Sequence, residues 1–449
     1  MKNKKDETRE SPPKYQAASS KGKVPRLRFP EFRDSEDWNE RALGDIAVFS
    51  SGGTPPKDIS DYWNGDIPWI SASSMHETSI DKSDLNITEL AVQDVSCLAK
   101  QGSLLILTRG SMLFKRIPIC ITTRDVAFNQ DVKALSVNSE IDNYFLLFQL
   151  NAAESNLLSI VGKTGIGAGK LETTDLQELT VYIAHKQEQL KIAACLSSLD
   201  SLLAAHAKKL EALKDYKKGL MQLLFPAEGE RVPRLRFPEF RAAKDWGNCQ
   251  LRDISELITK GTTPTTLGYQ YSDEGINFIK IESITLEGKL DINKMAHIDL
   301  ECYDALSRSK LEENDILFSI AGALGVVTRI PSEMLPANTN QALGIVRLKK
   351  DINTAFIEHL LKAPKTQKLI LGLKSGAAQS NISLQQLGEL EICLPSSTEQ
   401  QKIASTLSSL DSLIAAEARK IEELKEHKRG LMQGLFPSPE ESSELDTRK

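Results

Sequence analysis

Residues 188–202 read EQLKIAACLSSLDSL, and residues 399–413 read EQQKIASTLSSLDSL. The chain is duplicated at the opening of each half as well, because VPRLRFPEFR occupies residues 24–33 and returns at residues 232–241. The copies lie 211 residues apart for the first motif and 208 for the second. A repeat of this length far exceeds the roughly 20–50 residues of a solenoid unit. The sequence therefore predicts one duplicated, domain-sized unit, with two similar sites related by pseudo-twofold symmetry.

The stretch that begins at Glu188 predicts a long helix with a coiled-coil seam. Neither Gly nor Pro interrupts residues 188–218. Apolar residues recur there at alternating spacings of four and three, the a/d pattern of a coiled coil, and the second copy is apolar at every equivalent position. The central seam residues, expected to form a spacer or to bind a partner, are Leu196, Leu199, Leu203, Leu407, Leu410 and Ile414.

Two such helices in one chain should bury each other's seams. Each would run for about 37 residues, or about 55 Å, and an unpaired seam would expose a long apolar stripe. The junction LFPAEGERVPRLRF at residues 224–237 joins the first helix to the second opening motif. The LFP at residues 435–437 would stand in the same relation to the first opening motif. That relation requires antiparallel helices and brings the ends of the repeat together.

Polar residues interrupt each seam at two positions, His206 and Lys217 in the first helix and Glu417 and Lys428 in the second. His206 and Glu417 occupy the same seam position. A polar seam residue usually sets register at some cost in stability. Because antiparallel helices need not bring equivalent positions together, a direct His206–Glu417 contact is one hypothesis among others.

Composition is that of a soluble globular protein. The 449 residues are 40% hydrophobic and 26% charged, which leaves room for two or three domains. No run of about 18 apolar residues appears, and residues 1–16 lack the apolar core of a secretory signal. We therefore expect no membrane association and a cytoplasmic location. The net charge of −5 does not by itself indicate nucleic-acid binding, so positive charge would have to gather on one face or come from a partner.

Motifs of catalysis and metal binding are missing. The six cysteines form no CxxC pair and the histidines no HxxxH pair, so no metal site is expected. GKT at residues 162–164 lacks the glycine of a phosphate loop, since Leu157 stands there. SPPKY at residues 11–15 echoes an adenine-methyltransferase motif but has Lys14 where an aromatic ring must stack. The repeated unit is therefore expected to be a binder with no catalytic residue and no cofactor of its own.

The fold class expected is α+β: two pseudo-twofold-related globular domains separated by two long antiparallel coiled-coil helices. Short apolar runs such as Leu104–Leu107 and Ile316–Ile320 predict strands, and Tyr144–Leu158 predicts a helix. The boundaries expected are a disordered tail at 1–23, a first domain at 24–186, a spacer helix at 187–226, a second domain at 227–395, a second spacer helix at 396–437 and a disordered tail at 438–449.

These motifs together carry a resemblance to a known family. Each half opens with PRLRFPEF and a Trp and continues with a turn similar to Gly-Gly-Thr-Pro (Gly52–Pro55; Gly261–Pro264). Each half closes with EQxKIA, LSSLDSL, GLMQ and LFP. Over residues 24–437 this resembles the specificity subunit of type I restriction–modification systems. The resemblance implies two target-recognition domains, each of which reads one half of an asymmetric bipartite site in double-stranded DNA, and helices that set the spacing.

The resemblance also implies partners. Two adenine-N6 methyltransferase subunits would dock on the chain, and restriction subunits with nuclease and translocase activity would join them. S-adenosylmethionine, ATP and Mg²⁺ would bind to those subunits. Two other classes stay open from the residues alone, an autonomous DNA methyltransferase and a coiled-coil adaptor that does not bind DNA.

Candidate DNA contacts are cations and amides in or beside polar turns, because Arg and Lys donate to guanine and Asn pairs with adenine. They are Lys57, Arg109, Lys115, Lys163 and Lys170 in the first domain and Lys260, Lys280, Arg329, Lys374 and Asn381 in the second. Gln130 and Gln341 recur in both halves, which favours a structural turn or a backbone contact over base reading. Phe29 and Phe237 are identical in both openings, as equal docking of two methyltransferase subunits or packing against the helices would require.

Overall fold

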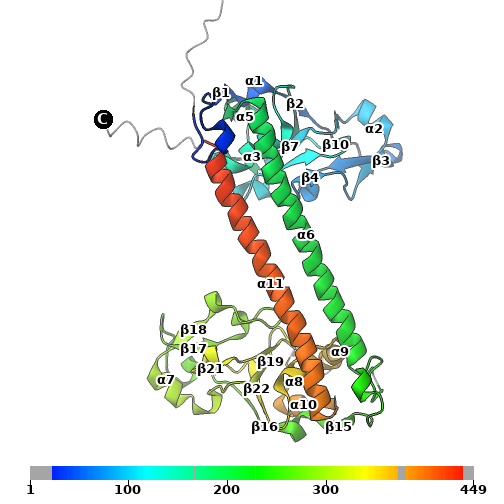
Figure 1. The fold of residues 1–449 in the computed structure, drawn as a ribbon, viewed down its shortest axis with the longest axis vertical. Helices are drawn as coiled ribbons and strands as arrows, with labels where there is room; N and C mark the ends of the chain where they lie inside the picture. Colours follow the sequence, from blue (N-terminus) through cyan, green and yellow to red (C-terminus); the bar gives the residue numbers. More distant parts are fainter. Residues whose placement is uncertain (1–22, 166, 228, 373–380, 438–449) are drawn as a thin grey trace, which may run out of the picture. The chain divides into compact units, whose positions relative to one another are not determined.

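The computed structural model describes residues 23–165, 167–227, 229–372 and 381–437 (Figure 1). The expected tails lie outside the described residues except for Lys23, which pairs with Trp38 through two backbone hydrogen bonds of 3.0 and 3.3 Å. The chain divides into two compact units, Met1–Ala205 with Ile421–Lys449, and His206–Lys420. Each unit contains one globular α+β domain and a half of both long helices.

The first domain contains fourteen named strands and five short α-helices within the described residues. The helices are α1 (Leu43–Ile46), α2 (Glu89–Asp94), α3 (Asn143–Ala152), α4 (Glu154–Ser159) and α5 (Thr173–Glu178). The strands are β1 (Asn39–Ala42), β2 (Ala47–Ser51), β3 (Trp63–Ile70), β4 (Ser79–Ile80), β5 (Asn86–Ile87), β6 (Leu98–Ala99), β7 (Leu104–Leu107), β8 (Arg109–Gly110), β9 (Ile119–Thr122), β10 (Val126–Phe128), β11 (Val132–Val137), β12 (Gly162–Lys163), β13 (Gly169–Lys170) and β14 (Thr180–Ile183).

The second domain repeats this organisation. Its helices are α7 (Leu300–Ala305), α8 (Thr354–Lys362), α9 (Pro364–Gly372) and α10 (Leu384–Gly388). Its strands are β15 (Gly247–Gln250), β16 (Ser255–Lys260), β17 (Ile276–Ile279), β18 (Ala296–Ile298), β19 (Ile316–Ser319), β20 (Val327–Arg329), β21 (Ala337–Thr339), β22 (Leu343–Leu348) and β23 (Glu391–Leu394). The two long helices are α6 (Lys186–Leu224) and α11 (Ser397–Leu435).

Both domains share one sheet scaffold. The order β2-β11-β7-β9 in the first corresponds to β16-β22-β19-β20 in the second, and the parallel pair β3–β10 corresponds to β17–β21. The central strands β7 and β19 are buried on both faces, as their apolar sequences LLIL and ILF allow, and the buried Ser319 that ends β19 donates its hydroxyl to the Ala321 carbonyl. The α+β prediction for each domain is confirmed.

The helix expected at Tyr144–Leu158 is wrong as a single element. Asp142 caps α3 by accepting a hydrogen bond from the Phe145 N–H (2.9 Å), and α3 ends at Ala152. Ala153 leaves the helical region with ψ of 12°, and α4 starts anew at Glu154. The Glu154 carboxylate accepts the Ile117 N–H at 2.9 Å, so the break places this side chain against a neighbouring loop.

The long helices differ by one to two residues from the expected ends. Each contains 39 residues, or about 58 Å of helix. Each stops two residues before a proline, Pro226 or Pro437, since a residue that precedes proline disfavours the helical region. At the start of α11 the Ser396 hydroxyl caps the helix by accepting the Glu399 N–H (3.4 Å).

Within each unit the two helices run antiparallel, side by side (Figure 1). In the first unit Ile192 and Leu196 near the start of α6 pack in one cluster with Leu435 at the end of α11. In the second unit Met221 and Leu224 near the end of α6 share a cluster with Ile403 and Leu407 near the start of α11. The predicted seam is therefore formed.

All four polar seam positions form ion pairs across the helices. His206 Nδ1 lies 2.6 Å from Glu417 Oε1, and Lys217 Nζ lies 2.5 Å from Asp411 Oδ1. Lys428 pairs with Asp200. The direct contact between the equivalent positions 206 and 417 is confirmed.

The opening motif of the first unit is anchored on the start of α6. The Arg28 guanidinium makes two bonds of 2.8 Å with the Glu188 carboxylate, and the Trp38 indole N–H donates to the same carboxylate at 3.2 Å. Glu188 keeps 1% of its side chain exposed. Hydrogen bonding to Glu188 raises the pKa of Arg28 despite the opposing effect of burial.

The second unit builds the same anchor from the second copy. Arg236 bonds Glu399 at 2.8 and 2.7 Å, and Trp246 donates to Glu399 at 3.3 Å. The repeated residues of the two sequence motifs, far apart in the chain, therefore meet in one buried network per unit.

The ends of the repeat meet in each unit as the sequence predicts. The Leu235 N–H donates to the Leu223 carbonyl at 2.9 Å, across the covalent junction between α6 and the second opening. In the first unit the Leu27 N–H donates to the Gly434 carbonyl at 2.8 Å without any such junction.

One described helix, α6, has the length and composition of a membrane span, with an 18-residue window of mean hydropathy 1.2. Its apolar residues Ile192 and Leu196 belong to the seam and are buried against α11. Pairing with α11 accounts for the apolar character of that part of the window.

Candidate nucleic-acid interface

Three of the candidate cations in the first domain lie on one small sheet of order β12-β13-β8. Arg109 pairs in register with Lys170, and Lys163 with Gly169. A side chain at Gly169 would lie 2.9 Å from Leu113 Cβ, so a glycine is needed where β13 crosses the preceding turn. The sheet therefore gathers Arg109, Lys163 and Lys170, which the sequence separates by up to 61 residues.

An aromatic ring accompanies this basic sheet. Lys163 Nζ lies 5.9 Å from the centroid of the exposed Phe114 ring, and Lys115 follows Phe114 directly. Lys170 forms an ion pair of 2.5 Å with Glu172 and is half-exposed. Cations and an exposed aromatic ring are the groups with which proteins bind phosphates and bases.

Lys57 belongs to a different part of the first domain. It is exposed in the loop that leaves β2, where the Trp63 indole donates to the Pro56 carbonyl at 2.9 Å. This loop lies beside the Asn129–Gln130 turn, because the Gly53 N–H donates to the Phe128 carbonyl at 3.0 Å.

The second domain pairs its cations with tyrosines instead. Lys280, a predicted contact, places Nζ 5.0 Å from the Tyr271 ring centroid, and Lys310 lies 4.1 Å from that of Tyr303. Lys260 is exposed at the end of β16, and Asn381 is exposed just before α10. Lys374 lies outside the described residues.

Arg329 is already engaged inside the second domain. Its Nε donates to Glu358 (3.1 Å) and its Nη1 to Asn314 (2.8 Å). Burial opposes ionisation of Glu358, but the nearby Lys362 and Arg329 hold its pKa below the ordinary value. Arg329 thus forms an ion pair within the second domain, while 38% of its side chain stays exposed and its DNA contact stays a prediction.

The predicted seam residues are covered by their own helix partners. Leu196 and Leu407 are fully buried, Ile414 is 8% exposed, and the remaining three are half-buried. Phe29 and Phe237 are half-buried beneath lysines of the adjoining helix, since Lys191 and Lys402 each lie 5.5 Å from the ring centroid. These contacts support a role in the spacer for the seam residues. They also support packing against the helices as the role of Phe29 and Phe237.

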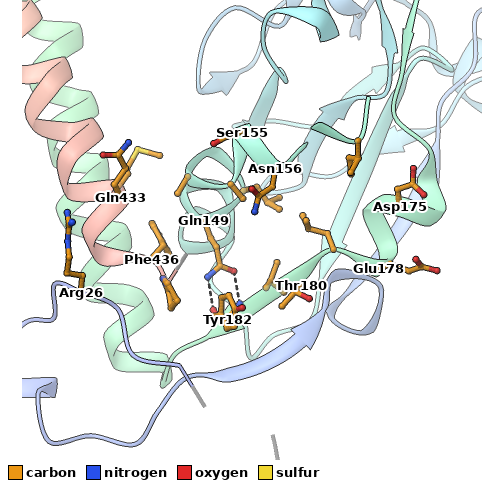
Figure 2. Close-up of a pocket in the computed structure, with 18 residues that line it drawn as sticks. Arg26, Gln149, Ser155, Asn156, Asp175, Glu178, Thr180, Tyr182, Gln433 and Phe436 are labelled. Atoms are coloured by element: carbon orange, nitrogen blue, oxygen red, sulfur yellow. Dashed lines mark hydrogen bonds between the residues drawn. The ribbon is translucent and has the colours of Figure 1, made fainter. Parts of the chain in front are cut away.

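A cavity of 780 Å³ lies in the first unit between the opening segment, α3 to α5 and the end of α11 (Figure 2). At its centre the Gln149 amide donates to the Tyr182 carbonyl (2.7 Å) and accepts the Tyr182 N–H (3.1 Å). Its charged lining residues are Arg26, Asp175 and Glu178, and neither His nor Cys lines it.

Across the residues that the structure describes, no group of three or more His, Cys, Asp or Glu side chains is arranged to hold a metal ion. Burial raises the pKa of the Cys120 thiol to about 12, so that thiol stays protonated and unreactive.

Sequence reasoning missed several basic residues that the fold brings beside the candidate sites. Lys133 on β11 donates to Ser51 at the end of β2 (2.5 Å), and Arg308 donates to Thr262 (3.1 Å). Both lie next to the Gly–Thr–Pro turns, but neither stands in a turn in the sequence. Pairing of β11 with β2 brings Lys133 there, and the 3-10 helix Ser307–Ser309 carries Arg308 to the second turn.

Comparisons with known proteins agree with this arrangement. The family model of the type I restriction modification DNA specificity domain matches residues 35–215 and 243–426, once in each half. The chain is 23% identical over 415 residues to the type I restriction enzyme MjaVIII specificity subunit of Methanocaldococcus jannaschii, covering 90% of this chain and 93% of that one. It is 32% identical over 174 residues to the EcoR124I/EcoR124II specificity subunit of Escherichia coli, covering 38% and 43%.

Solved structures share the fold. The S subunit of a type I restriction–modification system from M. genitalium superposes with a TM-score of 0.57 at 16% identity, over 93% of this chain and 100% of that one. A chain from a structure of complex assembly and conformational transition in the type I system gives a TM-score of 0.55 at 15% identity, over 89% and 98%. Two matched domains on the predicted scaffold lead to one conclusion: the chain belongs to the family of type I restriction–modification specificity subunits, whose role is DNA sequence recognition.

Proposed function

We propose that this chain reads an asymmetric bipartite DNA sequence, with one half-site for each domain. The observation that carries the proposal is a shared scaffold with different surface chemistry. The first domain presents Arg109 and Lys170 as cross-strand partners and Lys163 beside Phe114, whereas the second presents Lys280 and Lys310 on tyrosine rings. Because base edges are read by the side chains that reach them, two differently equipped surfaces support two different half-sites.

In this proposal the helix pair sets the spacing between the half-sites. Two readers placed alike on a duplex favour half-site centres about one helical turn, or ~34–36 Å, apart. Helices of about 58 Å are long enough for that span. Ion pairs at all four polar seam positions support a fixed register, and a fixed register gives one spacer length.

We further propose two equal docking surfaces for two adenine-N6 methyltransferase subunits. Equivalent apolar residues are exposed in both opening segments: Val24 (50%) with Val232 (40%), and Leu27 (43%) with Leu235 (39%). Restriction subunits would join this assembly in the cytoplasm. S-adenosylmethionine, ATP and Mg²⁺ would bind to the partner subunits and supply the methyl group, the energy of translocation and the metal for cleavage.

A chimera tests the reading of half-sites. Residues 243–395 are replaced by their first-domain counterpart, residues 35–184, and the chain is reconstituted with its methyltransferase subunits. Mapping N6-methyladenine on random-sequence DNA should show one asymmetric bipartite motif for the natural chain. The chimera should methylate a motif made of two inverted copies of one half at the same spacing. An unchanged motif would contradict one reader per half-site.

Two further assays distinguish this proposal from an autonomous DNA methyltransferase and from an adaptor that does not bind DNA. An autonomous methyltransferase would label DNA when the isolated chain receives S-adenosylmethionine, and we expect no labelling. An adaptor that does not bind DNA would give no bipartite footprint with the methyltransferase subunits present.

The number of methyltransferase subunits bound per chain tests the two docking surfaces. Leu27→Asp should lower the number of bound methyltransferase subunits from two to one, and Leu27→Asp with Leu235→Asp should abolish binding, as native mass spectrometry can count. Leu202→Asp, an exposed leucine on α6, is the control. Two bound subunits in the double variant would contradict these surfaces.

A further inference from the structure

The Gly–Thr–Pro turn and the Asn–Gln turn of the first domain form one composite loop. Gly52–Pro55 leave β2, and Asn129–Gln130 connect β10 to β11. The Thr54 hydroxyl donates to the Gln130 side-chain oxygen at 2.5 Å. A side chain at Gly52 would place its Cβ 2.0 Å from the Phe128 carbonyl oxygen, so only glycine permits this approach.

The second domain builds the same composite loop from Gly261–Pro264 and Asn340–Gln341. The Thr263 hydroxyl donates to the Gln341 side-chain oxygen, and the Thr262 N–H donates to the Thr339 carbonyl at 3.1 Å. A Cβ at Gly261 would again lie 2.0 Å from a carbonyl oxygen, that of Thr339. We call these two assemblies the Thr–Gln loops.

The Thr–Gln hydrogen bond contributes little to holding the loops together. Backbone bonds already join the two turns, and Asn129 and Asn340 brace their own turns by accepting the N–H two residues on (3.1 and 3.2 Å). Thr54, Gln130 and Gln341 are exposed, and water competes for an exposed neutral bond. What the bond does is orient each glutamine: its oxygen accepts from the threonine, and its amide N–H groups have no partner among the described residues.

A lysine accompanies each Thr–Gln loop, but from opposite strands. Ser51 and Lys133 are cross-strand partners on β2 and β11. The equivalent partners on β16 and β22 are Lys260 and Gly344. The positive charge is therefore kept in place while the residue that carries it changes strand. A change of this kind is expected where the charge itself has a role.

The next step rests on the proposed function. Two domains that read different half-sites must differ where they contact bases, but they can be alike where they contact phosphates. The Thr–Gln loops are alike and exposed, each presents the amide N–H groups of its glutamine, and each lies beside a lysine. We propose that each loop, with Lys133 in the first domain and Lys260 in the second, binds one phosphate of the DNA backbone and sets the domain's register on the duplex without reading sequence.

The test uses the full chain with its methyltransferase subunits and measures dissociation constants for a cognate and a scrambled duplex over a range of salt. Gln130→Ala should weaken binding to both duplexes by a similar factor of about five, the effect of one ordinary hydrogen bond in an exposed position. Gln130→Glu keeps the acceptor for Thr54 but opposes a phosphate, so it should weaken both by more than tenfold. Lys133→Ala should reduce the slope of log K against log salt by about 0.9. Lys100→Ala, an exposed lysine held by Asp125, is the matched control and should leave the slope unchanged.

Three results would overturn the proposal. Loss of affinity for the cognate duplex alone would mean that the loop reads bases. Unchanged DNA affinity with weaker methyltransferase binding would mean that it docks protein. A lower melting temperature for Gln130→Glu that accounts for the lost binding would mean that the loop is structural. Failure of the proposed function looks different, because the natural complex would then not distinguish the cognate duplex from the scrambled one.

Discussion

At the scale of single residues, two buried carboxylates hold the repeated motifs together. Glu188 and Glu399 keep 1% of their side chains exposed, and each accepts bonds from an arginine and a tryptophan of the opening motif. A buried carboxylate without its partner is costly, because it loses hydration and gains nothing in return. The arginine of each anchor is therefore a strong determinant of stability.

Arg236→Ala should lower the free energy of unfolding by about 3–5 kcal/mol, since it leaves Glu399 buried and unpaired. Chemical denaturation followed by circular dichroism measures the change. Arg234→Ala removes an exposed arginine two residues away and should stay within about 0.5 kcal/mol of the natural chain. Equal losses in the free energy of unfolding for the two substitutions would show that the Arg236–Glu399 pair does not contribute to stability.

His359 predicts a pH dependence of stability. Its ring is 3% exposed, with Nε2 3.2 Å from the Ser408 hydroxyl and Nδ1 3.9 Å from Asp411. Burial, helped by nearby Lys217, lowers the pKa of His359 from 6.5 to about 4. The unfolded chain takes up this proton near pH 6.5 and the folded chain only near pH 4. Stability should therefore be complete above pH 6.5 and fall by up to about 3 kcal/mol towards pH 4.

His359→Phe should remove that part of the pH dependence. The equivalent position of the first unit holds Phe148, whose ring lies 5.0 Å from Lys428 Nζ, so phenylalanine suits this environment. Melting temperatures between pH 4 and pH 7 provide the comparison. A variant that loses stability with acid as steeply as the natural chain would rule out His359 as the cause.

At the scale of elements, the helix pair combines an apolar seam with charged positions that select one register. The Glu417 carboxylate accepts a hydrogen bond from Lys209 Nζ (2.9 Å) and also contacts His206. These bonds hold the pKa of Glu417 below its ordinary value of 4.5. This contribution is present above about pH 4.5 and is lost as the pH falls through the lowered pKa. A histidine and a carboxylate at equivalent positions also favour α6 against α11 over either helix against a copy of itself, because a copy of α11 would place two carboxylates together.

Reversal of this pair tests its role. His206→Glu should lower the melting temperature at pH 7, because two carboxylates would then face each other across the seam. The double variant His206→Glu with Glu417→His should recover most of the loss. No recovery in the double variant would mean that the pair is not a coupled unit.

At the scale of the whole molecule, each unit closes the same contact between helix end and opening segment. The second unit has the covalent junction at residues 225–232, whereas the first closes the contact by noncovalent interactions, among them the Leu27–Gly434 hydrogen bond and the packing of Trp38 on Phe436. The contact therefore does not depend on the covalent connection. The order of the two repeats along the chain could therefore be exchanged by circular permutation without loss of this contact.

A circular permutant should fold and keep its DNA specificity. Pro437 is joined to Val24 by AEGER, the sequence of residues 227–231, and new ends are opened between residues 228 and 229. We expect the same methylated motif and a melting temperature within a few degrees of the natural order. A control opened between residues 196 and 197, inside α6 and its seam, should fail to fold. A permutant with a changed motif would contradict the equivalence of the two junctions.

Much of this architecture was predictable from the sequence because its signals are local or repeated. The spacing of Leu196, Leu199 and Leu203 follows from helix geometry alone, and Pro226 ends the helix for steric reasons. The duplication even indicated that equivalent ends meet. The break at Ala153 was not predictable, since the residues from Tyr144 to Leu158 all permit a helix and a tertiary contact of Glu154 accompanies the break.

The chain by itself determined the two-domain repeat, the antiparallel seam and the family to which it belongs. Only tertiary structure decided which side chains stand together: Arg109 beside Lys170, Lys133 beside the Gly–Thr–Pro turn, and Arg329 beside Glu358. The physical reason is that a helix seam depends on neighbours three and four residues apart. A recognition surface depends on strand pairing between segments tens of residues apart, and local sequence does not encode that pairing.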